Sequence, residues 1–146
     1  MSTLERAIVI ATEAHAGQVD KAGAPYILHP LRLMLQMDKT EDRIVAVLHD
    51  VVEDSDWTLQ RLRGEGFTRD IINAIDSVTW RKHEDYEDFI QRSIQNSIGC
   101  RVKLADLRDN SDLSRISDPK EADFKRVDTY RWAIREIEGH TQRSAL

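Results

Sequence analysis

The chain has 146 residues, of which 40% are hydrophobic and 32% are charged, and its formal net charge is −5. A chain of this length is expected to fold as one domain that buries about 70% of the surface exposed by the unfolded chain, so we expect a single domain over residues 1–146. Six Gly and three Pro are too few for a collagen-like or low-complexity chain. The negative charge disfavours nucleic acid as a partner.

Cysteine content and hydropathy indicate the compartment. Cys100 is the single cysteine, so no internal disulfide can form. No apolar run approaches the roughly 20 residues that cross a bilayer, and no signal-like segment opens the sequence. We therefore expect a cytoplasmic protein without a membrane segment.

The N-terminal third predicts two helices separated by a loop. Ser2 lies three residues before Glu5, which is the spacing of a capping box, and apolar residues at helical intervals predict a helix over 3–15. The stretch "AGQVDKAGAP" contains two Gly and a Pro and predicts a loop. An apolar pattern resumes in "YILHPLRLMLQM", with Pro30 in the first turn of the predicted helix.

The remaining sequence predicts only helices. Thr40 precedes "EDRIVAVLHDVVED", which reads as one continuous helix. Thr58 and Thr68 are predicted N-caps, the first for a short helix ending at Gly64 or Gly66 and the second for "RDIINAIDSVTW". Further helices are predicted at about 84–95, 97–110 and 119–138, the last with an apolar stripe that includes Phe124. No segment alternates with a period of two, so the predicted fold is all-α.

Charged residues interrupt the apolar segment "AVLHDVVEDS". On a helix, His49, Asp50, Glu53 and Asp54 would share one face, interleaved with Val and Leu. An exposed acidic helix end is the simplest interpretation of such a cluster. Burial of these carboxylates without a partner would cost several kcal/mol each, and a bound cation would remove that cost.

Two other segments place polar groups beside apolar residues. In "RVKLADLRDN", Asp106 and Asn110 are four residues apart, and Asp106 alone could be a helix cap or a surface acid. In "YILHP", His29 follows apolar residues, and alone it could be an ordinary core histidine. Neither segment is specific by itself.

The order of these residues carries more information than each alone. A His is followed about twenty residues later by an adjacent His-Asp pair and about fifty-five residues beyond that by an Asp. This order resembles the HD superfamily of metal-dependent phosphohydrolases. The stretches "HAGQVDKAGAPYILHP", "LHDVVEDSDWT" and "VKLADLRDN" resemble the hydrolase domain of RelA/SpoT-type enzymes and their small free-standing relatives, which hydrolyse guanosine 3′,5′-bispyrophosphate, (p)ppGpp, in the stringent response. The resemblance runs from about Ala14 to Tyr130.

The resemblance implies a single helical HD-type domain and assigns roles to its residues. The implied metal ligands are His29, His49, Asp50 and Asp106. The family's usual ion is Mn²⁺, with another divalent metal as the alternative, and mixed imidazole and carboxylate ligands suit such an ion. Glu53 and Asp54 are implied to orient or deprotonate the attacking water.

Substrate-binding residues are implied around this centre. The candidates are Lys21, Tyr26, Asn110, Arg126 and Tyr130, together with Arg81 at the end of a predicted helix. Each basic residue taken singly is more often solvated surface than a ligand. The larger aromatic side chains, including Trp80, are expected to pack between helices rather than to stack on a base.

Two positions depart from the (p)ppGpp hydrolases. Asp20 stands where that family usually has Arg, and Leu113 stands where it tends to have Thr. Three functions therefore remain open: a (p)ppGpp 3′-pyrophosphohydrolase, an HD phosphohydrolase acting on another nucleotide or phosphorylated metabolite, and a non-catalytic module that binds metal and nucleotide. The partner in each case is a phosphorylated small molecule, and the sequence leaves homo-oligomer formation open.

Overall fold

The structure, a computed structural model, describes residues 1–145, and this part of the chain is helical throughout its regular elements. The helices are α1 (Leu4–Ala14), α2 (Leu28–Gln36), α3 (Thr40–Leu48), α4 (Val51–Asp54), α5 (Leu59–Gly64), α6 (Arg69–Ser77), α7 (Tyr86–Ile94), α8 (Ser97–Asn110), the 3-10 turn η1 (Leu113–Arg115) and α9 (Glu121–Ala145). Within residues 1–145 the β structure amounts to one isolated bridge between Val19 and Pro25. The predicted all-α fold is confirmed.

Side-chain caps explain where several helices begin. The hydroxyls of Thr58 and Thr68 accept the N–H groups of Arg61 and Ile71 at 3.0 and 3.3 Å, as predicted. The predicted cap at Ser2 is wrong by one residue. Thr3 accepts the N–H of Arg6 at 3.1 Å instead, and the main-chain N–H of Ser2 donates to the carbonyl of Gly66 at 3.0 Å.

The predicted continuous helix through residue 54 is also wrong, because it breaks at His49 and Asp50. The Nδ1–H of His49 donates to the carbonyl of Ala46 at 2.7 Å. In an uninterrupted helix that carbonyl would accept the main-chain N–H of Asp50. The chain turns at this point and starts the short helix α4, so the two candidate ligands lie at a corner between helices.

The loop between α6 and α7 begins earlier than predicted, since α6 ends at Ser77. Trp80 lies in this loop and is 48% exposed, so the expectation that it packs between helices is wrong. Its main-chain N–H donates to the Glu53 carboxylate, and its indole N–H donates to the carbonyl of Glu84 at 3.0 Å. Phe124 on α9 is 53% exposed and does not belong to the buried stripe that was predicted there.

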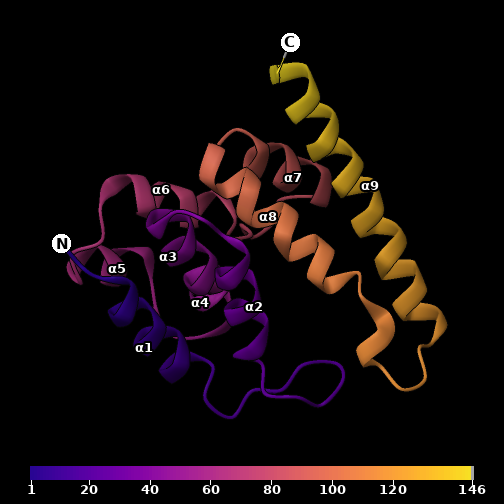
Figure 1. The fold of residues 1–146 in the computed structure, drawn as a ribbon, viewed down its shortest axis with the longest axis horizontal. Coiled ribbons are helices and arrows are strands. Elements are labelled where there is room, and N and C mark those ends of the chain that lie inside the picture. Colours follow the sequence, from indigo (N-terminus) through magenta and orange to yellow (C-terminus); the bar gives the residue numbers. More distant parts are fainter. Residues whose placement is uncertain (146) are drawn as a thin grey trace.

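Helix α8 joins two apolar cores. The larger core packs residues of α1, α2, α3, α5 and α6 against Val102 and Ala105 of α8. The smaller core packs Cys100 and Leu107 of the same helix against residues of α7 and α9. Figure 1 shows α8 running through the middle of the molecule, between the N-terminal helices and α9. Because α8 is covered from both sides, several of its polar side chains are buried.

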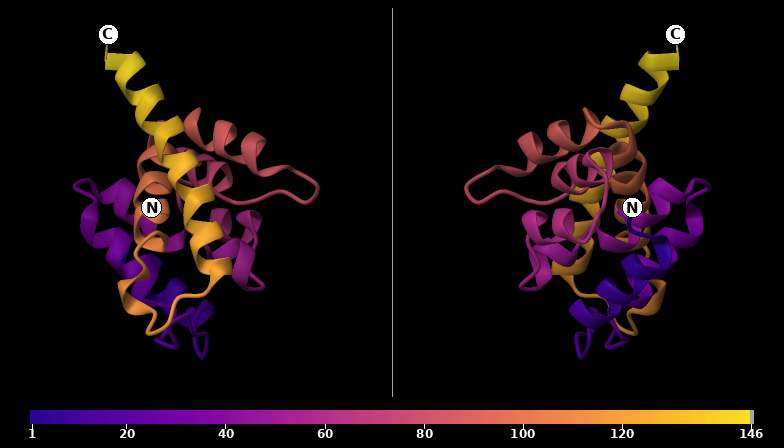
Figure 2. Two further views of the ribbon diagram at one scale, coloured as in Figure 1. Left: turned by 90° about the vertical axis from the view of Figure 1, so that its right-hand side faces the viewer. Right: turned by 90° about the vertical axis from the view of Figure 1, so that its left-hand side faces the viewer.

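Helix α9 is the longest element of the described chain. Its N-terminal part lies beside the loops that close one end of the molecule, and its C-terminal part extends beyond the other helices in all views (Figures 1 and 2). Among residues 1–145, none of the helices combines the length and the apolar character that a bilayer crossing requires.

The crossing of α6 and α8 requires a glycine. A Cβ placed on Gly99 would lie 2.0 Å from Oγ and 3.2 Å from Cβ of Ser77. We predict that Gly99→Ala lowers the free energy of unfolding by about 1–3 kcal/mol through overpacking, measured by urea denaturation. The matched control is Gly64→Ala, whose added methyl meets nothing within 4 Å and should be neutral or slightly stabilising. Equal stabilities of the two variants would contradict the close crossing.

Candidate active site

Four side chains from α2, the corner between α3 and α4, and α8 converge in the interior. The Nε2 of His29 lies 2.9 Å from Oδ1 of Asp106 and 3.8 Å from Oδ2 of Asp50. The Nε2 of His49 lies 3.0 Å from Oδ2 of Asp50 and 3.4 Å from Oδ1 of Asp106. We call His29, His49, Asp50 and Asp106 the convergent cluster. The structure thus brings together all four residues that the sequence proposed as metal ligands, from positions 77 residues apart.

Hydrogen bonds outside the cluster fix the orientation of both imidazoles. A carbonyl or carboxylate oxygen can only accept, so Nδ1 is the donor in each ring. Nδ1 of His49 donates to the carbonyl of Ala46 at 2.7 Å, and Nδ1 of His29 donates to Oδ2 of Asp109 at 2.6 Å. Each Nε2 is therefore turned toward the carboxylates. Such an outer hydrogen bond is the usual way of orienting a metal-ligating histidine.

The residues present fit a divalent cation. Among the residues that the structure describes, the buried Nε2 of His49 makes no hydrogen bond of acceptable geometry, although two carboxylates face it. Burial would lower the pKa of His49, but the negative charges of Asp50 and Asp106 outweigh burial and raise this pKa well above its usual value. The raised pKa favours a proton on Nε2 of His49. A ligating imidazole must be neutral, so a bound cation would replace this proton. His29, His49 and Asp50 each offer an atom within 4.8 Å of the others.

Lys103 is a buried charge at the site that the sequence interpretation missed. Its ammonium group lies 3.0 Å from Oδ2 of Asp106 and 4.7 Å from the ring centre of Phe89. Burial would lower the pKa of Lys103, but the charge of Asp106 outweighs burial and keeps this pKa raised. The spacing was the available signal, since Lys103 precedes Asp106 by one helical turn in an apolar segment.

Asp109 is a second missed residue and connects the cluster to two arginines. It accepts from Nδ1 of His29 and receives both Nε (2.8 Å) and Nη2 (2.9 Å) of Arg32. Arg115 donates to the main-chain carbonyl of Asp109 at 2.8 Å. Burial would raise the pKa of Asp109, but these hydrogen bonds from His29 and Arg32 outweigh burial and hold it far below its usual range. Asp109 therefore stays ionised and holds His29 in place.

The two acids of α4 lie beside the cluster. Burial raises the pKa of Glu53, although the N–H of Trp80 opposes part of this effect. Burial and then the charge of Asp50 raise the pKa of Asp54. Both carboxyl groups are thus better proton acceptors than free acids would be. Tyr26 donates its hydroxyl hydrogen to Oδ2 of Asp50 and so contacts the convergent cluster directly.

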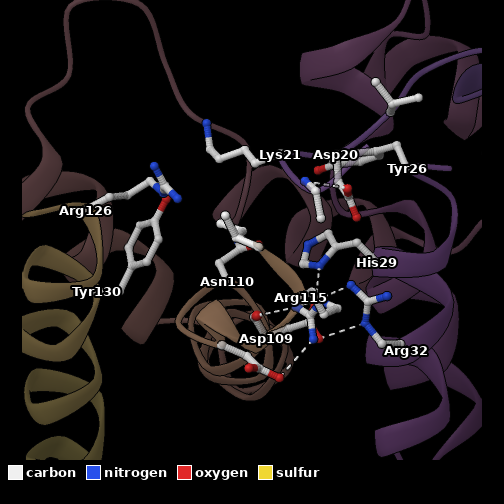
Figure 3. Close-up of a pocket in the computed structure, with 14 residues that line it drawn as sticks. Asp20, Lys21, Tyr26, His29, Arg32, Asp109, Asn110, Arg115, Arg126 and Tyr130 are labelled. Atoms are coloured by element: carbon white, nitrogen blue, oxygen red, sulfur yellow. Dashed lines mark hydrogen bonds and ion pairs between the residues drawn. The ribbon is translucent and has the colours of Figure 1, made fainter. Parts of the chain in front are cut away.

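A pocket of about 420 Å³ opens next to His29. Arg126 and Tyr130 of α9 form one side of it, His29 and Arg32 of α2 form the other, and the C-terminal end of α8 lies between them (Figure 3). The candidate residues that line it are Lys21, Tyr26, Asn110, Arg126 and Tyr130, and the further lining residues include Asp20, Arg32, Asp109, Asp112 and Arg115. We call this space the basic pocket.

Arg81 is the one substrate-binding candidate that the structure does not bring to the basic pocket. Its guanidinium pairs with Asp76 at 3.2 Å, and both side chains are exposed. Asn110 belongs to both regions, since it lines the pocket and its amide donates to Oδ1 of Asp106 at 2.9 Å. The basic pocket and the convergent cluster are therefore adjacent parts of one candidate site.

The helical fold and the order of His, His-Asp and Asp around one interior point define a domain of the HD type. No protein-family model matches the chain. Its sequence is homologous to curated proteins named guanosine-3′,5′-bis(diphosphate) 3′-pyrophosphohydrolase. It is 31% identical to the protein from Aquifex aeolicus over 119 residues, which is 73% of this chain and 17% of that protein. It is 30% identical to the one from Vibrio cholerae over 138 residues, which is 86% of this chain and 19% of that protein.

The chain therefore spans less than a fifth of the length of these two relatives. Among solved structures, a metazoan ortholog of SpoT that is described as hydrolysing ppGpp is similar over 100% of this chain and 98% of its own, with a TM-score of 0.66 and 22% sequence identity. That likeness establishes the fold. The resemblance inferred from the motifs is confirmed.

Metal binding at the convergent cluster predicts stabilisation of the fold. A ligand that binds only the folded chain at a hundredfold excess over its Kd adds about 2.7 kcal/mol, or roughly 5–10 °C in Tm for a chain of this length. We expect Mn²⁺ to raise the Tm of the wild-type chain by this amount in a thermal melt and EDTA to reverse the rise. His49→Asn should abolish the rise, whereas the surface control His83→Asn should keep it. A rise that persists in His49→Asn would place the ion elsewhere.

Proposed function

We propose that this chain is a metal-dependent phosphohydrolase that releases pyrophosphate from the 3′ position of (p)ppGpp. The observation that supports this proposal best is the position of the convergent cluster at the edge of the basic pocket. The similarity to proteins named (p)ppGpp 3′-pyrophosphohydrolases agrees with it. The proposal treats residues 1–146 as one HD-type domain whose partner is a phosphorylated nucleotide.

The proposed ligands of the metal are the four residues of the convergent cluster, and the proposed ion is Mn²⁺. Two imidazoles and two carboxylates suit an ion between the hard and the borderline class. When bound, such an ion lowers the pKa of water and neutralises charge on phosphoryl oxygens. Asp109 and Asn110 support the centre from outside, through His29 and Asp106 respectively.

Glu53 and Asp54 are the proposed acids that orient the attacking water and accept its proton. Burial raises the pKa of both carboxyl groups above that of a free acid, which favours proton acceptance. The two acids are not equivalent, because one oxygen of Glu53 accepts the N–H of Trp80. Glu53 is thereby held in one orientation and suits the positioning role, which leaves Asp54 as the better proton acceptor.

Arg126, Tyr130 and Lys21 are the proposed contacts for the leaving pyrophosphate. Arg126 is anchored by Asp123 at 2.8 Å, and Tyr130 follows it by one helical turn. A guanidinium can donate two parallel hydrogen bonds to phosphate oxygens, which gives geometric selection as well as charge. Lys21 adds a positive charge from the loop that also lines the basic pocket.

The direct test is hydrolysis of (p)ppGpp by the purified chain with Mn²⁺. We expect release of pyrophosphate rather than orthophosphate. Separation of the products on an anion-exchange column distinguishes the two. Asp54→Asn should reduce kcat by roughly 10²–10⁴-fold, because it removes the proposed proton acceptor. The surface variant Asp56→Asn is the matched control and should keep wild-type kcat. Release of orthophosphate, or equal rates in both variants, would contradict the assignment.

Asp20 favours a second candidate, a related HD phosphohydrolase with a different phosphorylated substrate. Its Oδ1 accepts the N–H groups of Ala22 and Ala24 at 2.9 and 3.0 Å, so the carboxylate shapes the loop that carries Lys21. It also places a negative charge in the wall of the basic pocket, where the (p)ppGpp hydrolases usually have Arg. A polyanionic nucleotide would be repelled from this wall.

Two variants separate the charge of Asp20 from its role in the loop. Asp20→Asn keeps an acceptor for both N–H groups and removes the charge, whereas Asp20→Arg reverses the charge and also loses the acceptor. We expect Asp20→Asn to raise kcat/KM for (p)ppGpp about tenfold, equivalent to about 1.4 kcal/mol, without lowering Tm. Asp20→Arg should raise kcat/KM at least as much but with a lower Tm. Unchanged kcat/KM in both variants would show that Asp20 does not select the substrate.

A further inference from the structure

His15 is a buried histidine that the proposed mechanism does not use. It lies at the C-terminal end of α1 and is 2% exposed. Its Nδ1 lies 2.9 Å from Oε1 of Gln18. The amide nitrogen of the same glutamine donates to two carbonyls, those of Ala14 at 3.2 Å and Asp54 at 2.9 Å. Both amide hydrogens are thus occupied, so Oε1 must face His15 and accept from Nδ1–H.

This network leaves the second ring nitrogen of His15 as a bare acceptor. Nε2 is buried and has no hydrogen-bond partner among residues 1–145. An unsatisfied buried polar atom costs about 1–3 kcal/mol, so the presence of an unpaired Nε2 calls for an explanation. Packing alone does not require it, because an apolar ring would fill the same volume.

The surroundings of His15 point to Asp54. Gln18 bonds the ring on one side and the main chain of Asp54 on the other, which connects the end of α1 to the end of α4. The ring of Tyr26 lies against His15 with 5.0 Å between centroids. A positive charge on His15 would lower the pKa of Asp54, which indicates that the two side chains lie near each other.

We propose, on the basis of the function proposed above, that His15 is a positioning residue for Asp54. Nε2 accepts a hydrogen bond from a water molecule whose other hydrogen is donated to the Asp54 carboxylate. Two acceptors that cannot bond each other are joined in this way by a molecule with two donors, which is the usual role of bridging water. Asp54 is then held by a side chain from α1 as well as by its own short helix.

Two substitutions separate Nε2 from the rest of the ring. His15→Asn retains a donor near the position of Nδ1 for Gln18 but has no atom at Nε2. His15→Gln retains a polar atom near Nε2 and loses the donor to Gln18. We expect His15→Asn to lower kcat roughly 10- to 100-fold with KM and Tm nearly unchanged, and His15→Gln to keep kcat within a few-fold of wild type.

The outcomes distinguish this inference from the proposed function. If the wild-type chain hydrolyses (p)ppGpp and His15→Asn is equally active, the inference alone is overturned. Equal losses of kcat and Tm in both variants would also overturn it, because the role of His15 would be structural. A wild-type chain that turns over no phosphorylated substrate would refute the proposed function and the inference with it.

A measurement without turnover checks the same geometry. The ¹⁵N chemical shifts of the imidazole should identify the tautomer with hydrogen on Nδ1 and an accepting Nε2. Hydrogen on Nε2 instead would overturn the inference, since that nitrogen could no longer accept from a water molecule.

Discussion

Compensation between buried charges is the constraint on which this structure depends. Asp106 enters the interior on α8 with three hydrogen-bond partners, the imidazole of His29 at 2.9 Å, the amide of Asn110 at 2.9 Å and the ammonium of Lys103 at 3.0 Å. Removal of one member of such a buried set leaves an uncompensated charge, which typically costs 3–5 kcal/mol. The helices that carry these groups cannot shift independently, so α2 and α8 are held in register by electrostatics as well as by apolar packing.

The same constraint explains why the site is built from segments far apart in sequence. His49 and Asp50 reach the cluster because the helix breaks where His49 takes the carbonyl of Ala46 for itself. Asp109 then orients His29 from the far side and is itself fixed by Arg32. Metal-ligand candidates and their orienting groups therefore form one connected network, and Gln18 separately connects the main chain of Asp54 in α4 to His15 at the end of α1.

Much of this arrangement could be predicted from the sequence, and the misses have physical causes. Helical periodicity and threonine caps placed most helices, and the order of His, His-Asp and Asp predicted four side chains that do converge. The break at His49 was missed because "VAVLHDVVED" keeps a helical pattern through the break, which depends on a side-chain hydrogen bond. Trp80 was misplaced because its exposure follows from a loop held by Glu53 and Glu84, two partners that composition does not identify.

The polar residues around the site were harder to predict than the cluster itself. Lys103 and Asp109 each lie three residues from Asp106, so helical spacing places both beside it. They were missed because the motif includes only the metal ligands. Arg81 lies outside the basic pocket and pairs with Asp76, a neighbour that its position near a helix end did not identify. Long-range partners such as Arg32 and Asp109, 77 residues apart, required the fold.

The division of the interior into two cores has a consequence for the width of the basic pocket. One wall belongs to α2, which packs in the larger core, and the opposite wall belongs to α9, whose Ala133 and Ile137 pack in the smaller core with α7 and α8. Changes in the packing of the smaller core can therefore alter the distance between the two walls of the pocket. Adding or deleting a methylene beneath α9 would move Arg126 and Tyr130 and so widen or narrow the opening, while the convergent cluster, which lies on other helices, stays in place. The choice of substrate can therefore change separately from the chemistry at the cluster.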